Sequence, residues 1–283
     1  MVLRALAITL ALCLSAAAAS AAELRVFDTR RGVVSDPASL FDAAARADAV
    51  FVGELHDDKA AHGLELELLQ ALAERGRPIV LAMEMFERDV QPALDAYAAG
   101  GIDEAEFLRR SRPWSNYRED YRPLVELARS HGWPIVAGNA PRPLASRIAR
   151  DGLAAVEALT PAERAQFAAE LNCPAGPYRD KFTAEMGEMA GHGRGASALR
   201  IDRMFESQCA KDETMAESVA ARLSQGTTVV HVNGAFHSDE AMGAADGLKR
   251  RRPDAKALVV SITKGASPQS AKRALGDFVV WTP

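Results

Sequence analysis

The stretch that decides the fold is Ala49-Val50-Phe51-Val52-Gly53-Glu54-Leu55-His56, an apolar run followed at once by glycine and polar residues. Similar apolar runs recur along the chain at 78–83, 134–137, 227–232, 257–262 and 277–281. Short β-branched runs separated by helical stretches are typical of strand and crossover-helix units. We therefore predict a three-layer α/β fold in which helices flank a largely parallel sheet.

Helical patterns fill the gaps between these runs. Residues 60–75 repeat leucine at helical spacing, at Leu64, Leu68 and Leu72, and the pattern stops at Gly76. Residues 120–130 are similar. Both segments are expected to pack against the sheet as helices.

Two regions depart from the alternation of strand and helix. Residues 152–223 contain no strand signal, so we expect a helical insertion there, with Thr160 as the N-cap of one helix. The glycine-rich stretch 186–195 predicts a mobile loop within that insertion. Residues 24–34 predict a small hairpin at the edge of the sheet.

The overall composition is that of a globular protein. The 283 residues are 48% hydrophobic and 25% charged, which excludes a disordered or collagen-like chain. The 34 Lys and Arg residues stand against 38 Asp and Glu, and no long run of one sign occurs. This balance argues against a nucleic-acid-binding surface.

Residues 1–22 have the pattern of a secretory signal peptide. Arg4 provides the positive end, residues 6–14 an apolar segment, and residues 16–22 the small side chains of a cleavage site after Ala21 or Ala22. We therefore expect an exported protein of the periplasm or cell envelope, with a single domain over 23–283. Leu12 stands before Cys13, where a lipoprotein signal has a small residue, so a lipid anchor is doubtful.

Two cysteines, Cys173 and Cys209, remain after such cleavage. In an oxidising compartment they can form a structural disulfide, and the alternative is a pair of buried thiols. Their spacing does not suggest a metal cluster.

The candidate functional residues follow the predicted strands directly. His56, Glu84, Asn139 and His237 each come just after an apolar run, and the carboxyl ends of parallel strands share the edge where such folds bind ligands. His56 and His237 both belong to Gly-x-x-His patterns, in which glycine allows a sharp turn. Two imidazoles and the carboxylate of Glu84 can bind a divalent metal, or act as base and acid on an ester or peptide. Asn139 can equally satisfy backbone groups in a turn, and we expect His231 in the core.

Several of these stretches together resemble the ChaN-like haem-binding protein family. The stretches are AVFVGELHDD (49–58) with His62 following, EMFE (84–87), YREDYRP (117–123), GNAPR (138–142), KDETMAE (211–217) and VNGAFHSD (232–239). They occur in the right order from about residue 35 to the C-terminus. The family is grouped more distantly with the Tiki/TraB metal-dependent proteases and the erythromycin esterases.

The resemblance implies an exported protein of haem or iron uptake that forms a homodimer around haem and works with outer-membrane haem-uptake machinery. Non-covalent haem needs an axial Tyr, His or Met, for which Tyr117, Tyr121 and His192 are the candidates, with Met186 and Met189 nearby. Arg112, Arg118 and Arg142 are expected to face solvent or pair with carboxylates before they contact propionates. The alternative is a metal-dependent or His/Glu-dependent hydrolase, in which His56, Glu84 and His237 are the catalytic residues or metal ligands.

Overall fold

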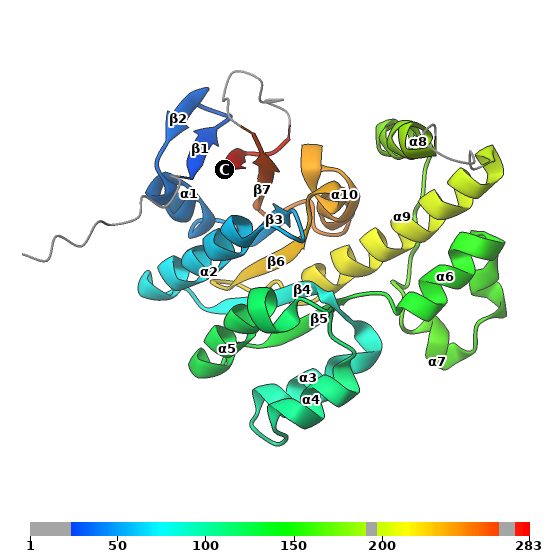
Figure 1. Cartoon of the computed structure of the whole chain (residues 1–283), viewed down its shortest axis with the longest axis horizontal. Helices are drawn as coiled ribbons and strands as arrows, with labels where there is room; N and C mark the ends of the chain where they lie inside the picture. Colours follow the sequence, from blue (N-terminus) through cyan, green and yellow to red (C-terminus); the bar gives the residue numbers. More distant parts are fainter. Residues whose placement is uncertain (1–23, 191–196, 266–274) are drawn as a thin grey trace, which may run out of the picture.

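The computed structural model describes residues 24–190, 197–265 and 275–283, and within these residues eight strands form one sheet (Figure 1). The strands are β1 (Arg25–Asp28), β2 (Val33–Ser35), β3 (Ala49–Glu54), β4 (Ile79–Glu87), β5 (Ile135–Asn139), β6 (Thr228–Gly234), β7 (Ala257–Lys264) and β8 (Phe278–Thr282). Their order in the sheet is β2-β1-β8-β7-β3-β6-β4-β5. Strands β3 to β8 run parallel, whereas β1 is antiparallel to β8 and β2. The predicted parallel sheet and edge hairpin are confirmed.

The central strand β3 is buried at every position and pairs with β6 on one side and β7 on the other. A strand covered on both faces needs apolar side chains throughout, which is why its sequence reads AVFV without alternation. The register places Gly53 beside Asn233 and Glu54 beside Gly234. The two Gly-x-x-His patterns therefore leave the sheet side by side.

Helices cover both faces of the sheet, and Figure 1 shows α2 and α5 on one side of the strands and α9 and α10 on the other. Leu64 and Leu68 of α2 pack with Val50 and Val52 on the first face. Met215 of α9 packs with Phe51 on the second. The helices are α1 (Pro37–Ala44), α2 (Lys59–Glu74), α3 (Gln91–Ala98), α4 (Glu104–Ser111), α5 (Arg122–His131), α6 (Arg142–Asp151), α7 (Pro161–Arg164), α8 (Pro177–Ala190), α9 (Ala198–Ala220) and α10 (Gly243–Arg251). The three-layer architecture is as predicted.

The described part of 152–223 contains α7, α8 and α9 and no strand, and residues 165–176 connect α7 to α8 without regular structure. Thr160 caps α7 as predicted, because its hydroxyl accepts from the Glu163 amide while the Glu163 carboxylate accepts from the Thr160 amide. The long helix α9 ends on the sheet, so its C-terminal half belongs to one of the three layers.

The prediction of a loop from residue 186 is wrong for residues 186–190, which complete α8. Phe182 and Met186 lie one turn apart on α8 and pack with Phe205 of α9, and this burial outweighs the glycine at 187. Residues 191–195 of the predicted loop lie outside the described residues, as do His192 and the predicted signal peptide with Cys13.

A disulfide joins Cys173 to Cys209, which settles the choice left open by the sequence. It fixes the segment before α8 to the middle of α9. Among the described residues, the helices include none with the length and apolar character needed to cross a membrane.

Candidate functional site

The structure brings His56, Glu84 and His237 together at the carboxyl edge of the sheet. Nε2 of His237 lies 3.2 Å from Oε1 of Glu84, and the amide of Gly234 donates to the other oxygen of Glu84 over 2.8 Å. A methyl group added at Gly234 would come within 2.6 Å of Nε2 of His56 and 3.6 Å of Oε2 of Glu84. The glycine at the end of β6 thus allows His56 to approach the carboxylate.

A buried carboxylate orients the imidazole of His56. Nδ1 of His56 lies 2.7 Å from Oε1 of Glu54, the last residue of β3. The hydroxyl of Tyr121 donates to the same oxygen over 2.7 Å. Tyr121 is one of the predicted haem ligands, whereas Glu54 is not among the predicted site residues although it stands inside the first Gly-x-x-His pattern.

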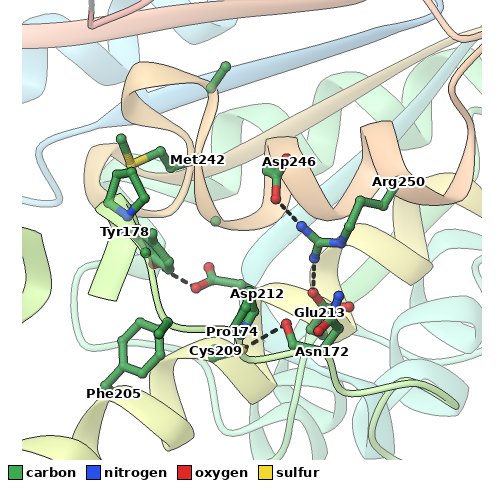
Figure 2. Close-up of a pocket in the computed structure, with 15 residues that line it drawn as sticks. Asn172, Pro174, Tyr178, Phe205, Cys209, Asp212, Glu213, Met242, Asp246 and Arg250 are labelled. Atoms are coloured by element: carbon green, nitrogen blue, oxygen red, sulfur yellow. Dashed lines mark hydrogen bonds and ion pairs between the residues drawn. The ribbon is translucent and has the colours of Figure 1, made fainter. Parts of the chain in front are cut away.

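A matching arrangement holds His237. Its Nδ1 lies 2.5 Å from Oδ1 of Asp212 on α9, and the hydroxyl of Tyr178 donates to Oδ2 of Asp212 over 2.6 Å. Figure 2 shows Tyr178 of α8 pointing at this carboxylate, where both line a cavity of about 270 Å³. Sequence reasoning missed Asp212 and Tyr178, although Asp212 lies in the stretch 211–217.

Each histidine is therefore the outer member of a His–carboxylate–Tyr chain. A carboxylate that accepts from Nδ1 fixes the ring orientation and makes Nε2 the atom available for proton transfer or ligation. The two hydrogen-bonded series come from different elements. For His56, the carboxylate is in β3 and the tyrosine is in the π-helical turn Tyr117–Tyr121. For His237, the carboxylate is in α9 and the tyrosine is in α8. Both end near Glu84.

The protonation states of His56, Glu84 and His237 are set by their burial and by the charged groups beside them. Burial lowers the pKa of His237, but Glu84 and Asp212 outweigh it and raise the pKa to about 9. Burial would raise the pKa of Glu84, yet His237 and His56 hold it well below its usual range. The pKa of His56 is raised because Glu54 and Glu84 outweigh its desolvation. Near neutral pH the site thus holds an ionised Glu84 against a protonated His237.

A cleft of about 720 Å³ opens beside these groups, within the size range of ligand pockets. Its lining includes His56, His237, Phe236, Lys59 and Asn116. The side chain of His56 is 43% exposed, and its ring contacts the ring of Trp114 edge-on at 4.8 Å. The His237 side chain is only 7% exposed.

The candidate haem tyrosines lie in the interior. Tyr117 packs against Phe86 and Phe107, and its hydroxyl has no hydrogen-bond partner among the described residues. Tyr121 is fully buried and donates to Glu54. A role for either as an iron ligand stays a prediction.

The remaining predicted side chains are placed as follows. Asn139 uses its side-chain oxygen to accept from the next amide, the turn role that was one of its two alternatives. His231 is fully buried in β6 and contacts Phe51 edge-on, as expected for a core residue. Arg112 pairs with Glu87 and Asp89, Arg142 pairs with Glu87, and Arg118 is exposed.

A second group of histidine and carboxylate side chains lies close to the predicted set. Among the described residues, the histidines and carboxylates whose ligand atoms all lie within 4.8 Å of one another are Glu54, His62 and Glu65. His56, Glu84 and His237 face one another more loosely, so their role as metal ligands stays a prediction.

Comparison with known proteins agrees with this architecture. The fold matches a structure described as cofacial heme binding to ChaN of Campylobacter jejuni, with a TM-score of 0.72, 16% identity, and coverage of 92% of this chain and 96% of that one. An erythromycin esterase mutant in its open conformation matches with a TM-score of 0.50, 12% identity, and coverage of 91% and 82%. None of the curated protein sequences compared with the chain matches it. A family model described as haem-binding uptake, Tiki superfamily, ChaN, matches residues 40–248. The chain therefore belongs to the ChaN haem-binding uptake family of the Tiki superfamily.

Proposed function

We propose that this chain binds haem non-covalently at the cleft beside His56 and serves haem or iron uptake in the cell envelope. The observation that carries the proposal is the family match over 40–248, which spans the strands that position His56, Glu84 and His237. The C. jejuni protein that shares the fold is described as a cofacial haem binder.

The residues of the cleft fit a haem. His56 provides a half-exposed imidazole whose Nδ1 is held by Glu54, the arrangement that orients a histidine for ligation through Nε2. Phe236 and the neighbouring Trp114 provide apolar surface, and the exposed ammonium of Lys59 is suited to a propionate. We therefore propose His56 as an iron ligand, with Tyr117, Tyr121 and His192 as the alternatives.

Titration with hemin tests this proposal. We expect a shifted Soret band that saturates at a defined stoichiometry, and its loss or displacement in His56→Ala. The matched control is His131→Ala, because His131 is an exposed imidazole at the end of α5, outside the cleft, and its ring contacts the ring of Trp133 at 4.6 Å. Tyr117→Phe and Tyr121→Phe test the phenol ligands separately. Hemin binding that does not saturate, or that is equally affected in both histidine variants, contradicts the proposal.

The same proposal includes export and assembly. Residues 1–22 support secretion to the periplasm or cell envelope, and the position of Leu12 before Cys13 supports a protein without a lipid anchor. N-terminal sequencing of the protein from fractionated cells is expected to begin near Glu23.

A homodimer around haem is expected to appear as a doubled mass in size-exclusion chromatography only when hemin is present. Coprecipitation from envelope fractions tests the outer-membrane uptake partner.

Hydrolysis is the second candidate function, and the paired His–carboxylate chains around Glu84 favour it. Glu84 forms an ion pair with the protonated His237 at 3.2 Å, so His237 can act as an acid held by Glu84, and His56 can accept a proton when neutral. A bound divalent metal would lower the pKa of an attacking water. Assay against activated esters and peptides, with and without Zn²⁺, tests this function. Activity that is lost in Glu84→Gln and His56→Ala supports it, and activity unchanged in both variants rules out this site.

A further inference from the structure

A second group of ionisable side chains lies behind His56. Glu54 ends β3, and His62 and Glu65 lie one turn apart on the first half of α2. Nδ1 of His62 is 2.9 Å from Oε2 of Glu54 and 3.4 Å from Oε2 of Glu65. The side chains of Glu54 and Glu65 are completely buried and that of His62 is 5% exposed. The group is separate from Glu84 and His237.

The two carboxyl groups of this group lie in the interior, where each needs a proton or a cation beside it. One carboxylate oxygen of Glu54 and one of Glu65 lie within 4.8 Å of each other in the interior. Buried carboxylates are stable only when a cation or a proton compensates them. The basic groups in contact with them are the imidazoles of His56 and His62. The buried Oε1 atom of Glu65 has no hydrogen-bond partner among the described residues.

Neighbouring side chains hold Glu54 and His62 in place. Tyr121 donates to Glu54 and contacts the ring of His62 edge-on at 5.0 Å, which fixes both side chains. The other ring nitrogen of His62, Nε2, faces Oδ2 of Asp120 at 3.7 Å. Histidines that bind metal through one nitrogen commonly present the other to a carboxylate.

We propose that Glu54, His62 and Glu65 bind a divalent first-row transition-metal ion through two carboxylates and Nδ1 of the imidazole. Their ligand atoms lie within 4.8 Å of one another, and a mixed set of nitrogen and carboxylate ligands suits Zn²⁺ or Mn²⁺. Glu54 and Asp120 also line the cleft, which provides a path for the ion to enter. Because Glu54 also holds His56, the ion would anchor the carboxylate that orients the cleft histidine.

Metal content of the purified full chain tests the proposal. The protein is equilibrated with excess Zn²⁺ or Mn²⁺, desalted, and analysed by mass spectrometry of the metal. We expect about one ion per chain, and affinity reduced more than about tenfold in Glu65→Gln. Glu67→Gln is the matched control, because Glu67 is an exposed residue of the same helix. Asp120→Asn, on the cleft side of His62, is also expected to weaken binding of the ion. This variant replaces Glu65→Gln as the test if Glu65→Gln does not fold.

Glu84→Gln distinguishes this position from the neighbouring histidine pair. It is expected to retain the ion, since Glu84 contacts none of the three ligands. A wild-type chain that retains neither metal overturns the proposal, and so does Glu65→Gln binding as tightly as wild type. Loss of the ion in Glu84→Gln with retention in Glu65→Gln also overturns it. Hemin titration of the same samples reports haem binding independently, so either conclusion can fail alone.

Discussion

The hydroxyl of Tyr178 donates to Asp212 over 2.6 Å, and Asp212 in turn contacts Nδ1 of His237. This relationship links α8, the helix that follows the disulfide-bonded segment, to the histidine in the short turn after β6. In the same way, the hydroxyl of Tyr121 donates to Glu54, and Glu54 in turn contacts Nδ1 of His56. The positions of both histidines thus depend on tyrosines distant in the sequence.

Replacing Tyr178 tests this dependence. Tyr178→Phe removes a donor from a buried carboxylate, so we expect the free energy of unfolding to fall by about 2 kcal/mol. Urea denaturation measures the change. Tyr97→Phe is the control, because Tyr97 donates to the more exposed Glu126 and should cost less. An equal or smaller loss for Tyr178→Phe contradicts the prediction.

The raised pKa of His237 predicts a pH dependence of stability. Its folded-state pKa, about 9, exceeds the usual 6.5 because Glu84 and Asp212 outweigh burial. Protonated His237 therefore contributes about 3 kcal/mol to the free energy of unfolding. This contribution is complete below pH 6.5 and is lost as the pH rises through 9. Unfolding of the metal-free protein at a series of pH values measures it.

His237→Gln is expected to remove this part of the slope. The pKa of His62 is raised to about 10, since Glu54 and Glu65 outweigh its desolvation, so some dependence remains in an overlapping range. If the free energy of unfolding of His237→Gln changed with pH as it does in wild type, the contacts with Glu84 and Asp212 would not be what raises the pKa of His237.

Gly234 leaves no room for a side chain. In Gly234→Ala the new methyl would lie 2.6 Å from Nε2 of His56, so the imidazole must move. We expect a loss of about 1–3 kcal/mol in stability and an altered hemin spectrum. Gly63→Ala is the control, because nothing lies within 4 Å of its added methyl, and it should stabilise α2 slightly. Equal effects of the two substitutions would refute the steric argument.

The disulfide restrains a loop of 36 residues in sequence separation. Removing it through Cys173→Ser with Cys209→Ser is expected to lower the free energy of unfolding by about 4 kcal/mol, mainly through entropy of the unfolded chain. Denaturation with and without reductant measures the effect. Reductant should destabilise wild type and leave the double variant unchanged, and an insensitive wild type would contradict the expectation.

Local patterns predicted much of the fold. Apolar runs such as 49–52 became central strands, and Thr160 capped a helix, because the apolar pattern of a strand and the capping residues of a helix are local features of the sequence. The loop predicted from residue 186 failed at its start because Phe182 and the partly buried Met186 pack with Phe205, a contact between helices that the local glycines do not reveal.

The sequence by itself determined that His56, Glu84 and His237 share one edge of a parallel sheet, because each comes just after an apolar run and parallel strands end together. The structure corrects one detail: His56 and His237 come after β3 and β6, whereas Glu84 lies within the second half of the longer strand β4. Only the tertiary structure decided which groups hold them. Asp212 and Tyr178 reach His237 from α9 and α8, and His62 and Glu65 reach Glu54 from α2. These partners are set by how helices pack on the sheet, and such packing depends on contacts between residues far apart in the chain.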